Sequence, residues 1–193
     1  DMFEDEVLGY LRERIDEFQE KIKEINTEWN DSLKEIEFII RFSKLLIRKI
    51  RSNPKVIIEG RRVIYGKMRK ISSNLLDYRD KVSKINRDLS ELFKRADTRR
   101  LKKKEKAQNL FDSLKESFEI VLEQIAEVKE TINSLISEVR QLENLSVETG
   151  YEESLQVVLL QEFNKLLGLL EIISNEIRDL FEEIEKIKKF LKQ

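Results

Sequence analysis

The fold is decided in the middle of the chain, by the stretch Lys94-Arg95-Ala96-Asp97-Thr98-Arg99-Arg100-Leu101-Lys102-Lys103-Lys104-Glu105-Lys106. It contains eight Lys or Arg and two acids. An apolar stripe approaches it from each side, and the two stripes differ in phase by one residue. A common core therefore cannot continue through the cationic positions between them. We expect the chain to turn back here. The alternative is one continuous helix of roughly 90 residues, whose cationic middle segment is exposed to solvent on all sides.

Two long helices are expected before this stretch. Apolar residues recur there at alternating steps of three and four, which places them on one face of a helix. The first such stripe runs from Leu8 to Ile50 and the second from Ile57 to Ala96, with unbroken alternation from Ile64 onward. Asn53-Pro54 separates them, because Asn is a good N-cap and Pro is favoured at the first helical position.

Two further helices are expected after it. Their stripes run from Ala107 to Leu142 and from Leu155 to Leu191. Between them, Thr149 and Glu152 have the spacing of a capping box. Gly168 is surrounded by leucines in the sequence and is expected to let another helix approach closely.

These segments predict an all-α fold, an elongated antiparallel four-helix bundle of long helices, about 42–50 residues each, with coiled-coil-like heptad packing. The helices are expected at about 3–52, 54–96, 98–147 and 150–193, in a single domain that spans residues 1–193. Trp29 lies on the first stripe and is expected in the core.

The composition gives little support to an enzyme. The chain has no Cys and no His, which removes the thiol nucleophile, the commonest general base and the commonest metal ligands. We therefore assign no catalytic, cofactor-binding or metal-binding residues and expect no enzymatic activity. The 39% of charged residues, with five Gly and one Pro, suits long helices.

The net charge of −1 conceals a strong asymmetry. Residues 41–106 hold 23 Lys or Arg and 7 Asp or Glu, a net of +16. The rest of the chain holds 14 basic and 31 acidic residues, a net of −17. Such a basic middle is either a binding face or a basic helix that lies beside acidic ones.

The basic stretch is the first candidate site, for an anionic partner. Its cations are Lys94, Arg95, Arg99, Arg100, Lys102, Lys103, Lys104 and Lys106. They form either a solvated turn or a contact with anionic lipid, nucleic acid or an acidic protein. Lipid is favoured over nucleic acid, because the cluster has no aromatic residue to stack a base.

The second candidate is an apolar face for a protein partner. Beside the stripes lie additional apolar residues, among them Phe38, Phe42, Leu45, Leu160, Phe163 and Leu167. These residues widen the stripe to form extra core, a homodimer face or a groove for a partner helix.

The sequence thus predicts a non-enzymatic helical-bundle scaffold or protein-interaction module, whose partner is another protein or a second copy. One alternative is a lipid-binding helical domain that uses the turn at 94–106. In outline such a domain resembles the helical sensor domains of bacterial chemoreceptors or the membrane-bending BAR domains. Another is a coiled-coil segment of a larger protein that contacts nucleic acid. A cytoplasmic location is marginally favoured, and a piece of a larger or membrane-anchored protein is also compatible with the sequence.

Overall fold

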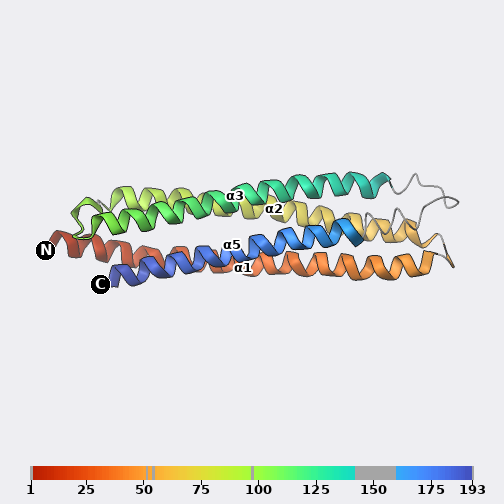
Figure 1. Cartoon of the computed structure of the whole chain (residues 1–193), viewed down its shortest axis with the longest axis horizontal. Helices are drawn as coiled ribbons and strands as arrows, with labels where there is room; N and C mark the ends of the chain where they lie inside the picture. Colours follow the sequence, from red (N-terminus) through yellow and green to blue (C-terminus); the bar gives the residue numbers. More distant parts are fainter. Residues whose placement is uncertain (1, 51, 54, 97, 142–159, 193) are drawn as a thin grey trace. The chain divides into compact units, whose positions relative to one another are not determined.

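The computed structural model describes residues 2–50, 52–53, 55–96, 98–141 and 160–192. This part of the chain contains four α-helices and no strand (Figure 1). The elements are α1 (Met2–Ile50), α2 (Val56–Arg95), the short 3₁₀ helix η1 (Thr98–Arg100), α3 (Lys104–Gln141) and α5 (Phe163–Lys192). The prediction of an all-α fold built on long helices is confirmed. None of these helices is long and apolar enough to cross a membrane, among the residues that the structure describes.

The helices pack into two compact units, to each of which all four contribute a part. The first unit comprises Asp1–Glu28, Tyr78–Gln124 and Ile173–Gln193, and the second comprises Trp29–Asp77 and Ile125–Ile172.

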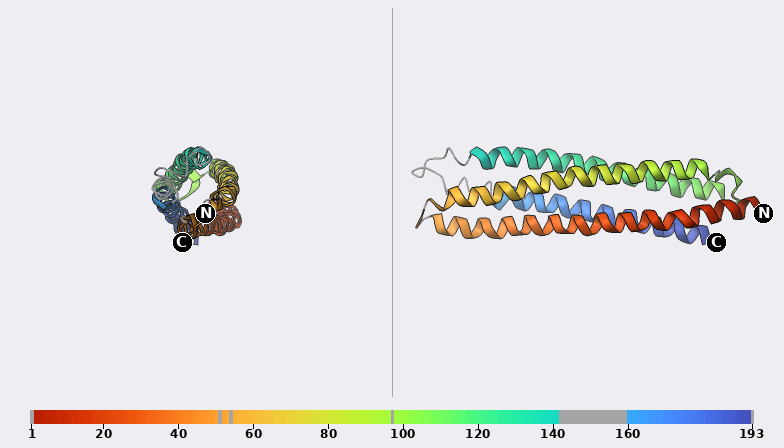
Figure 2. Two further views of the ribbon diagram at one scale, coloured as in Figure 1. Left: turned by 90° about the vertical axis from the view of Figure 1, so that its right-hand side faces the viewer. Right: turned by 180° about the vertical axis from the view of Figure 1, so that it is seen from behind.

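In the first unit, the contacts show that neighbouring helices are antiparallel. Arg12 Nε on α1 donates a hydrogen bond of 2.5 Å to the Leu191 carbonyl of α5. About two turns farther along α1, the Gln19 side-chain amide donates to the Glu185 carboxylate at 2.6 Å. The residue number rises along α1 while it falls along α5. In two views, the start of α1, the end of α5 and the connection between α2 and α3 lie at one end of this unit (Figures 1 and 2).

The second unit repeats the antiparallel arrangement. Glu35 on α1 pairs with Lys67 on α2 at 2.8 Å, and farther along α1 the Leu46 side chain meets Gly60 on α2. Between α2 and α3, the same reversal is seen at the hydrogen-bonded pairs Tyr65–Arg140 and Ser72–Asn133.

The core consists of the predicted stripes. Among the stripe positions whose side chains are described, all are buried except Leu8 on α1. Trp29 is fully buried, as expected, and its Nε1 donates a 3.0 Å hydrogen bond to the Leu170 carbonyl of α5. Ser43 also lies on the stripe and is fully buried, and its hydroxyl donates to the Ile39 carbonyl of its own helix.

The connections between the helices begin and end at other residues than the sequence predicted. The turn between α2 and α3 is present, but α3 begins at Lys104 where the sequence indicated residue 98. Between α1 and α2, the Asn53 carbonyl accepts a hydrogen bond from the Val56 N–H at 3.1 Å, which opens α2. Pro54, the capping box at Thr149–Glu152 and the expected ends of the helices at 147 and 150 lie outside the described residues.

Close helix approach occurs at a different glycine from the one expected. A Cβ added to Gly168 would meet nothing within 4 Å, so the expectation that it permits close packing is wrong. A Cβ added to Gly60 would lie 2.6 Å from Leu46 Cδ1 and 2.7 Å from Cδ2. Leu46 is 2% exposed, and its surroundings therefore limit how far it can move away.

These two environments predict opposite substitution effects within one helix. Gly66→Ala should raise the free energy of unfolding by about 1 kcal/mol, because Gly66 is exposed and nothing lies near its added methyl group. Gly60→Ala should gain less or destabilise, because the methyl group displaces buried Leu46. Urea unfolding of both variants gives the comparison. An equal gain at the two positions would contradict the close approach at Gly60.

Candidate functional site

The basic turn, Lys94–Lys106, joins α2 to α3 in the first unit. The Ala96 N–H still bonds to the Leu92 carbonyl at the end of α2, and the Ala107 N–H bonds to the Lys103 carbonyl as α3 begins. Between them, η1 is closed by a bond from the Leu101 N–H to the Thr98 carbonyl at 3.1 Å. Leu101 is only 4% exposed, so one apolar side chain anchors the middle of the turn.

All eight cations that the sequence assigned to this site are exposed to solvent. Within the described part of the chain, none of the following five has an ion-pair partner: Lys94, Arg95, Lys102, Lys103 and Lys104. The turn therefore presents a dense positive charge on a backbone that its buried Leu101 holds in place.

Two cation–aromatic contacts connect the turn to the ends of other helices. The Arg100 guanidinium lies 4.9 Å from the centre of the Phe3 ring of α1, and the Lys106 ammonium lies 5.8 Å from the Phe190 ring of α5. Phe190 is buried, whereas Phe3 is 50% exposed. The site thus combines exposed cations with one exposed aromatic ring, a feature that the sequence reading of the stretch alone did not include.

Elsewhere on α2, basic residues are paired internally. Lys81 lies 2.9 Å from Glu28 of α1 in the first unit, and Lys67 and Lys70 flank Glu35 of α1 in the second. The hydrogen bond from Lys67 holds the pKa of Glu35 below its ordinary value. Both interpretations of the charge asymmetry therefore apply, each to a different part: pairing along α2, and exposed charge at the turn.

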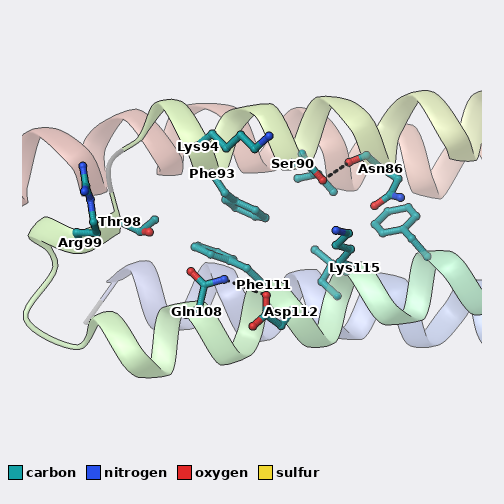
Figure 3. Close-up of a pocket in the computed structure, with 13 residues that line it drawn as sticks. Asn86, Ser90, Phe93, Lys94, Thr98, Arg99, Gln108, Phe111, Asp112 and Lys115 are labelled. Carbon is teal, nitrogen blue, oxygen red and sulfur yellow. Dashed lines mark hydrogen bonds between the residues drawn. The ribbon is translucent and has the colours of Figure 1, made fainter.

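A groove lies beside the turn, between α2 and α3 of the first unit (Figure 3). Its volume is about 560 Å³. At its turn end, the rings of Phe93 and Phe111 stack with centroids 3.5 Å apart. Sequence reasoning missed this groove, because it depends on how side chains from two different helices leave space between them.

The six residues of the predicted apolar face have different environments in the second unit. Phe38 and Leu45 are 38% and 53% exposed, while Phe163 is fully buried and belongs to the core. Phe42, Leu160 and Leu167 are partly exposed. Phe38 and Phe42 are brought together as a stacked pair with centroids 5.8 Å apart.

The wider stripe on α1 is buried on one side only. Ile40 and Ile47, which follow stripe positions, are 6% and 8% exposed. Phe38 and Leu45, which precede stripe positions, remain open to solvent. Of the alternatives that the sequence left open, extra core therefore applies to Ile40 and Ile47, whereas Phe38 and Leu45 belong to an apolar surface strip.

One carboxylate of the first unit lies in an unfavourable environment. Glu183 Oε1 on α5 accepts a 2.8 Å hydrogen bond from the Ser117 hydroxyl of α3, while its Oε2 is buried without a hydrogen-bond partner among the described residues. Burial raises the pKa of Glu183 above its ordinary value, and the Ser117 hydrogen bond opposes this shift only in part.

This raised pKa predicts a pH-dependent gain from Glu183→Gln. When the pKa of a carboxyl group is higher in the folded than in the unfolded state, the free energy of unfolding falls as the pH rises through that folded pKa. Replacing Glu183 with neutral Gln should therefore raise the melting temperature near about pH 7, and the gain should vanish toward about pH 4. The exposed neighbour Glu182→Gln is the control. Melting curves that show the same gain at both pH values would refute the assignment.

No protein-family model, curated protein or solved structure matches this chain.

Proposed function

We propose that this chain is a non-enzymatic helical-bundle scaffold that docks through its basic turn onto an anionic membrane surface. The observation that carries the proposal is that all eight cations are exposed, on a turn anchored by buried Leu101. Five of them have no ion-pair partner among the described residues, so their charge is available to an external anion.

Electrostatic attraction to phosphate headgroups contributes about 1 kcal/mol for each Lys or Arg near the surface. Because Leu101 and the two cation–aromatic contacts already order the turn, little conformational entropy is lost when it binds. A cluster of this size is therefore sufficient for docking without a deep pocket.

The aromatic ring beside the turn favours lipid over nucleic acid. Exposed Phe3 lies beside Arg100, and an exposed aromatic ring next to a cation is typical of protein surfaces that rest in the headgroup region. Binding of single-stranded nucleic acid requires ring faces on which bases stack. One face of Phe3 is occupied by Arg100, and the Phe93 ring stacks on Phe111.

The test is sedimentation with vesicles of phosphatidylserine and phosphatidylcholine. Replacing Arg95, Arg100, Lys102, Lys103 and Lys104 with Gln should weaken binding by at least about 100-fold, since each cation contributes about 1 kcal/mol. The control replaces five exposed cations of the second unit, Lys34, Arg41, Lys44, Lys49 and Lys55, and has the same net charge. It should bind nearly as well as the unaltered chain.

Two results would overturn membrane docking. The first is equal loss in the two variants, which would indicate an effect of net charge alone. The second is a failure of the unaltered chain to bind anionic vesicles while it binds a DNA duplex in a salt-dependent manner. That second outcome would favour the nucleic-acid alternative.

A second candidate function is self-association through the apolar strip of α1 in the second unit. Phe38, Phe42 and Leu45 lie at positions i, i+4 and i+7, on one side of the helix. Phe38 and Leu45 are 38% and 53% exposed and Phe42 is partly exposed, and large apolar side chains left open at this spacing are typical of a surface that packs against another helix.

Self-association is tested by the concentration dependence of mass in analytical ultracentrifugation. The unaltered chain should dimerise, and Leu45→Glu should be monomeric because it places a charge within the apolar contact. Ile120→Glu, at a 39% exposed apolar position of the first unit, should dimerise normally. A monomeric unaltered chain at all concentrations would exclude this function.

A further inference from the structure

The groove between α2 and α3 follows the direction of the two helices. Its lining residues on α2 recur from Asn86 to Lys94, and those on α3 recur from Gln108 to Phe118, in steps that keep them on one face of each helix. At a rise of 1.5 Å per residue, the groove follows the two helices for roughly 15 Å. This shape suits an extended chain better than a compact ring system.

Its floor is apolar. The side chains that form it are Leu89, Phe111, Leu114 and Phe118, which are 2%, 5%, 1% and 1% exposed. Phe93 stacks on Phe111 at the turn end, so a flat ring can enter there only by separating this pair. A flexible hydrocarbon chain can lie along the floor without such a rearrangement.

Its rim carries a net positive charge. Three cations, Lys94, Arg99 and Lys115, line the groove together with one carboxylate, Asp112. The Asp112 carboxylate accepts a 2.9 Å hydrogen bond from the Gln108 amide. Figure 3 shows Lys115 reaching from α3 into the space between the helices, and Lys94 extending along α2 toward Ser90. Within the described residues, neither lysine has an ion-pair partner.

We infer that this groove binds a single-chain amphiphile with an anionic headgroup, such as a fatty acid. The hydrocarbon chain lies on the floor of leucine and phenylalanine side chains, and the carboxylate is held by Lys115 with Lys94 as the second cation. A volume of about 560 Å³ falls in the range of small-molecule sites, which are mainly apolar and contain a few polar groups that fix orientation. The groove shares Lys94 and Arg99 with the basic turn, whereas the five cations that are neutralised in the vesicle test lie outside its lining.

The probe is dodecanoate, titrated below its micelle concentration into the full chain and followed by calorimetry, with uncharged dodecanol as the matched ligand. Dodecanoate should bind with one molecule per chain, at least about tenfold more tightly than dodecanol, because a charge-assisted hydrogen bond is made only by the carboxylate. Lys115→Ala should remove this preference, and Lys129→Ala, elsewhere on α3, should preserve it.

A second variant tests the location. Ser90 lines the groove and is only partly exposed, so Ser90→Trp should fill the groove and abolish binding of both ligands. Ser113→Trp, at an exposed position of α3 outside the lining, is the control, and circular dichroism checks that both variants fold. Unchanged binding in Ser90→Trp, or no saturable heat with the unaltered chain, would overturn the inference.

The variant with a neutralised turn distinguishes this site from membrane docking. Its five substitutions leave every residue of the groove lining in place. It should lose vesicle binding and still bind dodecanoate. Loss of both would mean that dodecanoate binds to the exposed cations, and the groove assignment would fail.

Discussion

Every feature of this chain depends on the burial of four apolar stripes with a period of three and four residues. A helix with one apolar face is stable only when another element covers that face. Here the covering elements are the other helices, and the antiparallel contacts of each unit keep the stripes facing one another. Side chains such as Trp29, Phe118 and Leu75 are almost completely excluded from water as a result. Truncating residues of this kind in other cores costs several kcal/mol, so the register of the stripes dominates the stability.

The basic turn follows from the same constraint. Because the stripes of α2 and α3 are out of phase, no helix that continued through the stretch could keep both faces buried. The chain therefore reverses, and the only large apolar side chain between the two helices, Leu101, turns inward. Among the described residues, Lys94, Arg95, Lys102, Lys103 and Lys104 have no ion-pair partner, unlike Lys81 and Lys67 along α2. A concentration of exposed positive charge is the consequence of ending a core at this point.

Sequence periodicity predicted the core well, because burial of a helix face is determined locally by spacing. It predicted the start of α3 less well, since the inward turn of Leu101 depends on tertiary contacts rather than on propensity. Environments that depend on the register between helices could not be predicted. The raised pKa of Glu183 requires knowing that α3 covers it, and the difference between Gly60 and Gly168 requires knowing where Leu46 lies. The groove beside Phe111 belongs to the same class, because it is a gap between residues far apart in the sequence.

The residues adjacent to the stripes explain where further surfaces arise. On α1 of the second unit, Ile40 and Ile47 follow stripe residues and are buried, whereas Phe38 and Leu45 precede stripe residues and are open. A helix covered by its neighbours on one side of the stripe leaves the other side to solvent, and apolar residues there gain nothing from the fold of their own chain. Phe163, which is fully buried, lacks this open side and contributes to the core instead. The apolar strip of α1 and the exposed cations of the turn therefore have a similar origin: both lie where the buried stripes end or are covered on one side only, and both face solvent.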